Sequence, residues 1–434
     1  MSENESKVSM EELVSLAKRR GFIFPGSEIY GGLAGTWDYG PLGILLKNNI
    51  RQEWWKRFGL NRDDMFGKET AILMKSKIWE ASGHVQNFSD PMVDCKKCKS
   101  RFRADKIDVK DGCPQCGAKD FTEARPFNMM FKTHAGPVED SSTEVYLRPE
   151  TAQGMFVNFK NVLDTMRPKL PFGIAQTGRA FRNEITPGNF IFRTREFEQM
   201  EIEYFIRPGD WEKHFESWLS EIHKWTKFIG INTIHDREVE GADRAHYSKR
   251  TIDIDFDYPF GREELYGLAY RGDFDLQSHI KSSGQEISYF DEETKEKIVP
   301  HVIEPTFGVD RTVLAVLLNA YHKEGDRVVL KLKPLVAPYK VAVFPLVGNK
   351  ENITAKANEV YTSLKSKMST VWDARGNIGK RYYAQDEIGT PWCVTVDYQT
   401  LEDDTVTVRD RDTMRQERMK ISELADYFQK NINR

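Results

Sequence analysis

The sequence predicts an α+β protein of two domains: an antiparallel sheet in residues 1–333 and a smaller α/β domain in residues 334–434. The larger domain is predicted from residues 181–184 and 193–201, which we interpret as parts of adjacent strands. The loop between them has the Pro, Gly and Asn expected of a strand connection. The smaller domain is predicted from strands and helices that alternate over roughly 100 residues. A length of 434 residues agrees with two or three domains.

Two helices and a strand are expected near the N-terminus. Ser9 and Glu12 form a capping box, which opens a helix that ends near Arg20. A second helix is expected at 41–58, because it starts with a proline and has apolar residues along one drifting stripe. A strand is expected at about 69–74.

Four cysteines lie in residues 91–135, which we interpret as an insertion. The pairs Cys95/Cys98 and Cys113/Cys116 have the spacing of a structural zinc ribbon, in which four thiolates close a tetrahedron around Zn²⁺. A metal-free knuckle is the alternative. Disulfides are disfavoured in a reducing cytosol.

The middle of the chain indicates a helix and a strand with mostly structural roles. Residues 211–229 repeat large apolar residues at helical spacing, which favours core packing over stacking on nucleic acid. Residues 252–258 alternate apolar residues with Asp253, Asp255 and Asp257, which indicates a solvated strand face rather than a cation site.

A strand, a glycine and a helix follow one another in residues 302–321. The apolar residues of the helix recur at i, i+3, i+4 and i+7, which predicts a buried stripe of Leu314, Leu317, Leu318 and Tyr321. Arg311 is therefore expected in the first helical turn, beside backbone N–H groups that favour anions.

Beyond residue 333 the pattern predicts a separate unit. Strands are expected at 340–344, 371–372, 392–396 and 405–408, with helices at 352–367 and at the C-terminus. Cys393 lies in an apolar strand, which predicts a buried thiol.

The composition does not decide the partner. A net charge of −3, from 63 basic and 66 acidic residues, counts mildly against a dedicated nucleic-acid-binding module. An enzyme that binds RNA transiently needs only local basic groups. There is no apolar run long enough to span a bilayer and no signal peptide, so we expect a cytoplasmic protein without membrane contact.

Five motifs stand in order along the chain, at residues 36–43, 148–154, 181–201, 198–203 and 303–311. Together they resemble the motifs of the class II aminoacyl-tRNA synthetases and, more narrowly, of the glycyl-tRNA synthetases. The resemblance runs from about residue 10 to the C-terminus. It implies a homodimeric class IIa enzyme that attaches glycine to tRNA(Gly) through a glycyl-adenylate, with a catalytic domain followed by an anticodon-binding domain.

In the resembled family the helix at 41–58 and the following strand form the dimer element. The proline usual in that strand is absent from 69–74, so dimerisation rests on the resemblance alone. Basic residues at helix ends of the C-terminal domain, Arg375, Lys380 and Arg381, are candidates for RNA contact, although a solvated face is the simpler interpretation.

The resemblance also implies an ATP site. Arg182, Glu184 and Arg311 are its catalytic residues: Arg182 bridges the glycine carboxylate and the α-phosphate, and Arg311 clamps the nucleotide from the other face. Phe197 stacks under adenine, and Arg193 meets the γ-phosphate. The full ATP-binding set is Arg182, Asn183, Glu184, Phe192, Arg193, Phe197, Glu264, Leu265, Gly308 and Arg311.

A glycine site is implied beside it, where acidic residues hold the ammonium group. The set is Arg103, Glu150, Phe197, Glu201, Glu304, Thr306 and Gly308. Glu304, with Glu264, is the candidate for Mg²⁺ that accompanies ATP. Thr306 stands where the family more often has serine. From composition alone, the run at 101–106 that contains Arg103 indicates a solvated loop, and Glu150 and Glu201 could be surface partners of Arg148 and Arg195.

Two other functions fit parts of the pattern. One is a binding protein on the same fold, like the accessory subunit of mitochondrial DNA polymerase, but such a protein has no need for Arg182, Glu184, Arg193, Glu304 and Arg311. The other is a class IIa synthetase for proline, serine or threonine, which residues 148–154 and the glutamates argue against.

Overall fold

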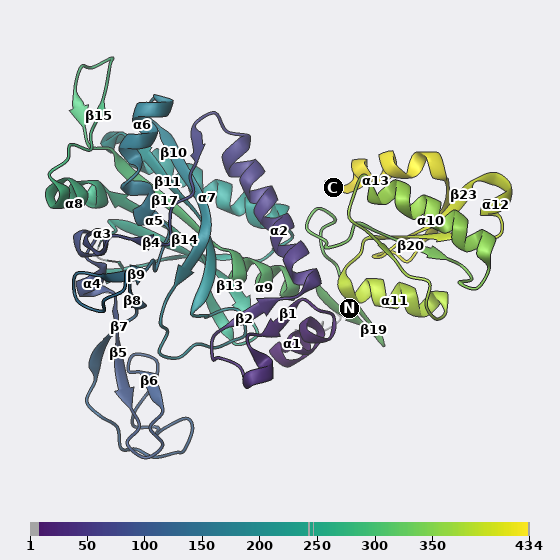
Figure 1. Ribbon diagram of the computed structural model, residues 1–434, viewed down its shortest axis with the longest axis horizontal. Helices are drawn as coiled ribbons and strands as arrows, with labels where there is room; N and C mark the ends of the chain where they lie inside the picture. The colour runs from purple at the N-terminus through teal and green to yellow at the C-terminus, as the bar shows by residue number, and fades with distance from the viewer. Residues whose placement is uncertain (1–7, 242–243, 246, 433–434) are drawn as a thin grey trace.

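Seven strands form the central sheet of the larger domain (Figure 1), in a computed structural model that describes residues 8–241, 244–245 and 247–432. The strand order is β12–β13–β14–β17–β11–β10–β3, and all neighbours are antiparallel except β3 and β10, which are parallel. The strands are β3 (Met65–Gly67), β10 (Phe172–Phe181), β11 (Glu196–Ile206), β12 (His235–Glu238), β13 (Arg250–Tyr258), β14 (Gly261–Gly272) and β17 (His301–Gly308). The antiparallel sheet predicted from the sequence is confirmed.

Helices cover the two faces of this sheet unequally. On one face the largest apolar core of the molecule packs α1 (Met10–Arg19), α2 (Pro41–Trp55), α7 (Trp211–Phe228) and α9 (Val309–Ala320) against the strands. On the other face, α5 (Ala152–Phe156), α6 (Phe159–Met166) and α8 (Phe274–Ser283) pack a second core. Polar side chains of β11, β14 and β17 share this second face.

The predicted helices are present. Ser9 caps α1 in a capping box with Glu12. Pro41 begins α2, which continues as a short π-helix, η2 (Lys56–Leu60). The apolar residues predicted in α7 and α9 are buried, with two exceptions: Trp211 of α7 is half-buried, and Tyr321 lies just past the end of α9 and begins β18 (Tyr321–Glu324).

The strand expected at 69–74 is wrong. Only β4 (Leu73–Met74) forms there, and it pairs with β9 (Glu144–Leu147), while the strand that joins the central sheet is the earlier β3. The reason is a side chain: Arg148 donates to the carbonyl of Thr70 and to its hydroxyl, which takes this segment out of a sheet ladder.

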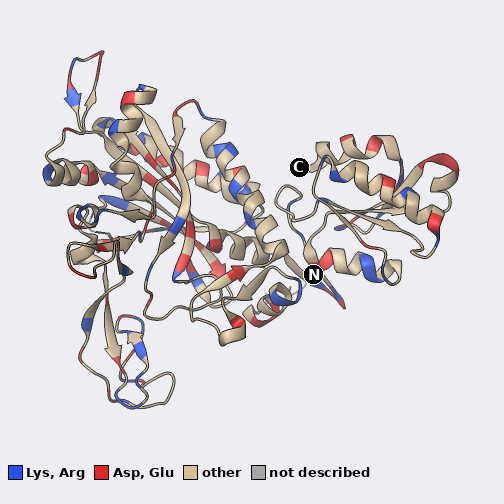
Figure 2. Ribbon diagram, in the orientation of Figure 1, with Lys and Arg blue, Asp and Glu red and all other residues tan. Residues whose placement is uncertain are grey.

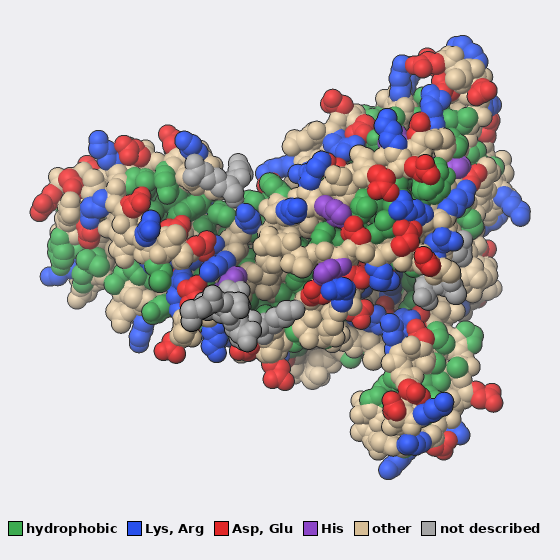
Figure 3. All heavy atoms as spheres, turned by 180° about the vertical axis from the view of Figure 1, so that it is seen from behind, with side chains coloured by type: hydrophobic (Ala, Val, Ile, Leu, Met, Phe, Trp, Pro, Cys, Tyr) green, Lys and Arg blue, Asp and Glu red, His purple; other side chains and the backbone are tan. Residues whose placement is uncertain are grey.

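The cysteine-containing segment forms a projecting lobe, joined to the body by a narrow neck (Figure 3). Its sheet has the order β6–β5–β7, with β5 (Ser89–Asp94), β6 (Arg101–Arg103) and β7 (Arg125–Asn128). We call residues 88–128 the lobe. The loop expected at 101–106 is therefore wrong for its first three residues, because they pair with β5.

Short elements connect these parts. They are β1 (Ile23–Pro25), η1 (Glu28–Tyr30), β2 (Trp37–Tyr39), α3 (Ser76–Ala81), α4 (His84–Asn87), β8 (Lys132–His134), η3 (Pro208–Asp210), β15 (Tyr289–Phe290), β16 (Lys297–Ile298) and β19 (Arg327–Leu330). The hairpin of β18 and β19 follows α9 and leads to the second domain.

The C-terminal domain has a five-stranded sheet in the order β21–β20–β22–β23–β24. Its strands are β20 (Val341–Pro345), β21 (Thr370–Trp372), β22 (Trp392–Val396), β23 (Thr405–Asp410) and β24 (Gln416–Lys420). Its helices are α10 (Glu351–Lys365), α11 (Ile378–Ile388), α12 (Thr400–Asp403), η5 (Ile421–Glu423) and α13 (Leu424–Ile432). The α/β pattern is confirmed, Cys393 is buried, and α11 and β24 were not foreseen.

Two expectations about charged residues need correction. Asp255 is buried rather than solvated, because Arg237 of the neighbouring strand covers that face and pairs with both Asp255 and Asp253. Arg381 is buried too, and its guanidinium donates to the carbonyls of Pro345 and Leu346. No helix in the described part of the chain is long and apolar enough to cross a membrane.

Candidate functional site

One pocket gathers nine of the ten residues predicted to bind ATP. It lies where the loop between β10 and β11 faces the start of α9. The predicted residues that line it are Arg182, Glu184, Phe192, Arg193, Phe197, Glu264, Leu265, Gly308 and Arg311. Asn183 instead lines a neighbouring groove between the lobe and the loop.

The residues of the motif at 181–201 were expected on strands, but only part of them lie there. Strand β10 ends at Phe181 and β11 begins at Glu196, so Arg182, Glu184 and Arg193 lie in the connecting loop. The loop folds back on itself, with hydrogen bonds in both directions between Gly188 and Arg193. It therefore brings Arg193 into the same pocket as Arg182.

Arg182 is held in place from two sides. Its Nε donates to the carbonyl of Pro149 at 3.0 Å. Its guanidinium lies 5.2 Å from the ring centroids of both Phe88 and Phe197. A guanidinium placed against aromatic rings keeps its charge and loses little freedom when it binds an anion.

Arg311 lies in the first turn of α9, as predicted. Its Nη1 contacts the carboxylate of Glu264 at 3.1 Å and donates to the carbonyl of Glu264 at 2.9 Å. Its guanidinium also lies 4.4 Å from the ring centroid of Phe192. The positive end of the helix adds to its charge, so this side of the pocket favours a phosphate.

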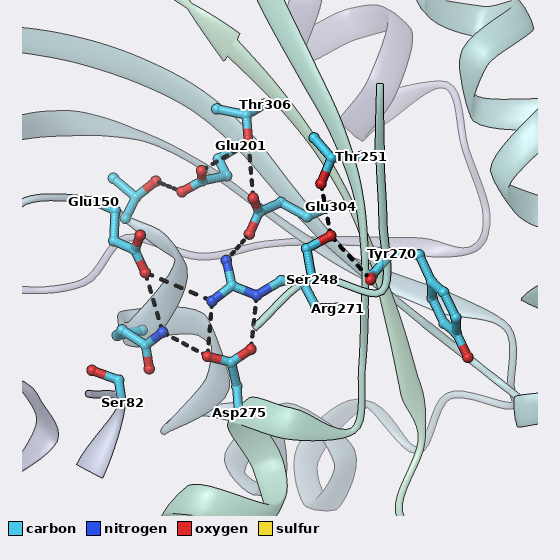
Figure 4. Close-up of polar contacts among 12 residues, drawn as sticks. Ser82, Glu150, Glu201, Ser248, Thr251, Tyr270, Arg271, Asp275, Glu304 and Thr306 are labelled. Carbon is cyan, nitrogen blue, oxygen red and sulfur yellow. Dashed lines mark hydrogen bonds and ion pairs between the residues drawn. The ribbon is translucent and has the colours of Figure 1, made fainter. Parts of the chain in front are cut away.

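Three glutamates predicted to bind glycine come together beside this pocket (Figure 4). The register of β11 against β17 puts Glu201 opposite Thr306, and Glu304 lies on the same face two residues earlier. The hydroxyl of Thr306 donates to Glu201 at 3.0 Å and contacts Glu304 at 3.4 Å. Thr306 also lines the first pocket, so the two parts of the site are continuous.

These glutamates are not surface partners of Arg148 and Arg195. Glu150 and Glu201 are only 6% and 2% exposed. Glu150 pairs with His84 at 3.2 Å, and Glu201 accepts from the hydroxyl of Thr151. That alternative interpretation is therefore wrong.

Arg271 organises the cluster and was missed in the sequence. It is 1% exposed, makes a two-bond contact with Asp275 at 2.7 and 2.8 Å, and pairs with Glu304. It also lies 4.0 Å from Glu150. The available signal was an arginine in an otherwise apolar strand with an aspartate four residues later, in residues 265–275.

The cluster has a surplus of negative charge. Four buried carboxylates, Glu150, Glu201, Glu304 and Asp275, lie around the guanidinium of Arg271, and a fifth, Glu203, is buried close by. Burial, only partly offset by Arg271, raises the pKa of Glu304 to about 8. Burial and the charge of Glu150 also raise the pKa of Glu201. Such a pocket favours a small cation, which would relieve the repulsion between the carboxylates.

Arg103 lies apart from this cluster. It is in the lobe, where it pairs with Asp90 at 2.6 Å and with Asp105 at 2.8 Å. Its charge acts on Glu184, which lines the first pocket. Its predicted contact with glycine stays a prediction.

The four cysteines of the lobe fit a tetrahedral metal. Their sulfur atoms all lie within 4.8 Å of one another, with Cys95–Cys116 and Cys98–Cys113 each at 3.6 Å. A Zn²⁺ ion with four Zn–S bonds of about 2.3 Å requires sulfur–sulfur distances of about 3.8 Å. Among the described residues no other group of His, Cys, Asp and Glu side chains has this metal-binding geometry.

Comparison with known proteins identifies two separate regions of the chain. Residues 131–320 match the family described as the tRNA synthetase class II core domain (G, H, P, S and T), and residues 340–431 match the anticodon binding domain. The chain is 52% identical to the glycine–tRNA ligase of Alkaliphilus oremlandii, over 98% of each chain. It is 50% identical to that of Geobacillus thermodenitrificans over 99% of each, and 51% identical to that of Clostridium acetobutylicum over 98% of this chain and 99% of the relative.

Proposed function

The chain belongs to the glycine–tRNA ligases, a family of class II aminoacyl-tRNA synthetases, and from this premise we propose how its residues divide the work. The enzyme uses ATP to attach glycine to tRNA. In the first step the glycine carboxylate attacks the α-phosphate and pyrophosphate leaves. In the second, a ribose hydroxyl of tRNA takes the glycyl group and AMP leaves. The observation that supports the assignment best is the acidic cluster that joins the Arg182 pocket through Thr306.

Arg182 is proposed to hold the reacting carboxylate and the α-phosphate together. Both groups are anionic, and charge builds on the phosphate oxygens during attack. A fixed guanidinium neutralises that charge in the transition state without taking or giving a proton. The chain's own contribution is thus mainly positioning and electrostatics, and no protein nucleophile is needed.

The other pocket residues are proposed to hold the nucleotide. Phe197 offers an aromatic face for adenine, next to the guanidinium of Arg182. Arg193 and Arg311 lie on different elements of the same pocket, which suits them to the γ-phosphate and to the opposite side of the nucleotide. Glu184 is proposed to contact either the amino group of adenine or the part of the site that holds the amino acid.

Glycine is proposed to bind with its ammonium group among Glu150, Glu201 and Glu304. Glycine has no side chain to recognise, so the enzyme is proposed to recognise its ammonium group. Selectivity then depends on excluding larger amino acids. Thr306 stands over two of these glutamates and is the candidate for that exclusion.

A divalent metal accompanies ATP in this reaction, and Mg²⁺ is the ion we propose. When bound to the phosphates, it makes pyrophosphate a better leaving group. Of the two carboxylates expected to hold it, Glu264 lines the Arg182 pocket, where it pairs with Arg311, whereas Glu304 lies on the glycine side and pairs with Arg271. We therefore propose Glu264 as the principal ligand, with Glu304 shared between metal and glycine.

The zinc site, the RNA contacts and the assembly are also proposals. The sulfur geometry of the lobe supports one structural Zn²⁺. Basic and acidic residues alternate over both domains (Figure 2), so contact with tRNA(Gly) would depend on local groups such as Arg375 and Lys380 of the C-terminal domain. Arg381 is removed from that set because it is buried.

A homodimer in the cytoplasm is proposed from the family together with the surface of α2. A groove of about 1050 Å³ runs beside α2, and two exposed apolar side chains, Ile44 and Leu60, lie among the mostly polar and charged residues that line it. A second copy of the chain would cover these side chains.

ATP–pyrophosphate exchange with a panel of amino acids tests the assignment. We expect exchange with glycine and not with alanine, serine, proline or threonine. Arg182→Ala should lower the glycine-dependent rate by roughly 10²- to 10³-fold, as expected for one lost charge stabiliser. Arg179→Ala is the control, because Arg179 lies only three residues earlier, near the end of β10, but is exposed and pairs only with Glu196 in the described structure. A wild-type rate in Arg182→Ala would sink the assignment of this residue.

A further inference from the structure

The C-terminal end of α11 has two acidic residues, Asp386 and Glu387, and no basic residue in its last turn. Negative charge is unfavourable there, because the last carbonyls of a helix already form the negative end of its dipole. The arginines that pair with the two carboxylates come from other elements, and three of them come from the larger domain. The acidic end is therefore explained by contact between the domains.

Asp386 makes the inner part of this contact. It is fully buried, and it accepts from Arg327 of β19 at 2.9 Å and from Arg409 of β23 at 2.9 and 3.0 Å. Removing one partner of a buried ion group leaves the other charges buried and unpaired, which is costly. We therefore expect this part of the contact to stay closed.

Glu387 makes the outer part. It accepts from Arg19 at 2.9 and 3.1 Å and also pairs with Arg20, at the end of α1. The side chains of Arg19 and Arg20 are 51% and 30% exposed. Ion pairs that face solvent are weak and screened by salt, so this part of the contact can open while the Asp386 part holds.

Both contacts are close, along the chain or through hydrogen bonds, to elements that shape the Arg182 pocket. Arg327 lies on the hairpin that follows α9, and α9 begins beside Arg311. Arg20 precedes Gly21, whose carbonyl accepts from the first turn of α2 at Leu42. Next to that turn, Tyr39 donates to Asp310, the neighbour of Arg311. The end of α11 is thus fixed to the elements that shape the pocket.

The other end of α11 faces the solvent with Lys380, and Arg375 lies just before the helix. These are the residues proposed above to contact RNA. A small rotation of α11 about Asp386 would therefore swing the RNA-facing end relative to the pocket.

We infer that Glu387 is a positioning residue for the transfer of glycine to tRNA. With Arg19 and Arg20 it sets the angle of the C-terminal domain about the Asp386 contact, so that a tRNA held by this domain presents its acceptor end to the pocket. Glu387 touches neither ATP nor glycine. The inference rests on the charging reaction described above, and it assigns to Glu387 a role in the second step only.

The test compares the two steps in one full-length variant, Glu387→Gln, which keeps the shape of the side chain and removes its charge. We expect kcat/KM for tRNA in aminoacylation to fall about threefold to tenfold, the size expected for a partly exposed ion pair. Glycine-dependent ATP–pyrophosphate exchange should stay within about twofold of wild type, since the pocket itself is untouched. Asp397→Asn is the matched control: Asp397 makes a similar two-bond pair with Arg418, within the C-terminal domain.

Reversing the charges on both sides of the Glu387 contact distinguishes the loss of this ion pair from misfolding of the variant. Arg19→Glu with Arg20→Glu should give the same defect from the other side of the contact, and adding Glu387→Arg should restore most of the tRNA kcat/KM. An equal fall in exchange and aminoacylation, an unchanged tRNA kcat/KM in Glu387→Gln, or a triple variant no better than the double would each overturn the inference. Absence of exchange in the wild-type protein would instead refute the proposed function.

Discussion

Thr306 is the residue on which selection of glycine is expected to turn. Its hydroxyl contacts Glu201 and Glu304, and its methyl group adds bulk at the same place. Thr306→Gly should raise alanine activation relative to glycine by about tenfold or more, because one methyl group of space corresponds to roughly 1–3 kcal/mol. Exchange rates with alanine and glycine measure this ratio.

Thr306→Ser serves as the matched variant, since it removes the methyl group and keeps the hydroxyl. If the methyl group of Thr306 excludes alanine, Thr306→Ser should relax the selectivity as Thr306→Gly does. If the hydrogen bonds of the hydroxyl matter more, Thr306→Ser should keep the wild-type selectivity. A ratio unchanged in both variants would remove Thr306 from the explanation of selectivity.

Glu304 should make glycine activation depend on pH. Burial, opposed by Arg271, raises the pKa of Glu304 to about 8, so below that pH its carboxyl is protonated and attracts the ammonium group less. We expect kcat/KM for glycine to rise as the pH passes through about 8, and the rise to be absent in Glu304→Gln. The pH profile of exchange measures this, and an identical profile in the variant would refute it.

The raised pKa of Glu304 also makes the stability of the protein depend on pH. A raised pKa means that the folded protein holds this proton where the unfolded chain has lost it, between the ordinary glutamate value and about 8. The contribution of Glu304 to the free energy of unfolding therefore falls as the pH rises through that window. Bound glycine should offset part of this loss.

At the scale of single residues, sequence reasoning found the side chains that stand in motifs and missed those that support them. Glu150, Glu201 and Thr306 were predicted and do come together. The supporting roles of Arg271 and Gln153 were not predicted. Gln153, for example, donates to Asp275, which lies 122 positions further along the chain. Such a contact depends on the register of distant elements, which no local pattern contains.

At the scale of elements, the lobe should depend on its metal site. Cys113→Ser removes one of four ligands, so we expect the bound zinc to fall from one ion per chain to none, with local unfolding of the lobe. Metal analysis of the purified protein measures this. Cys393→Ala is the control, because Cys393 is buried in the C-terminal domain and should leave the zinc in place. A wild-type protein that carries no zinc would contradict the proposal.

The elements also show where sequence patterns suffice. The capping box of α1 and the apolar stripe of α9 are local signals, and both helices form as predicted. The strand at 69–74 failed because the side chain of Arg148, far along the chain, takes the carbonyl and hydroxyl of Thr70. Strand β6 was missed because it has three residues and pairs with only one neighbour.

At the scale of the whole molecule, the groove beside α2 predicts self-association. Ile44→Glu removes one of the two exposed apolar side chains that line this groove and puts a charge where we expect the second chain to pack. We expect this variant to shift the protein from dimer to monomer, as measured by sedimentation. Val138→Glu is the control, because Val138 is also exposed but does not line this groove. A wild-type protein that is monomeric at micromolar concentration would contradict the prediction.

The change of pattern past residue 333 predicts a second domain, but no pattern in the sequence predicts how the two domains meet. The contact depends on Asp386 and Glu387, which in the sequence are two ordinary acidic residues at the end of a helix that was itself missed. Only the fold brings Arg19, Arg20 and Arg327 to them.

The two segments that enter and leave the lobe are held together where β5 ends. Asp94 and Thr122 lie side by side there, joined by two hydrogen bonds of 2.9 Å, and the cysteines lie beyond them around a small core of their own. The residues between these two positions can change in number without moving the strands below. We therefore expect insertions and deletions in the evolution of this enzyme to accumulate within the lobe, while the spacing of residues in the central sheet stays constant.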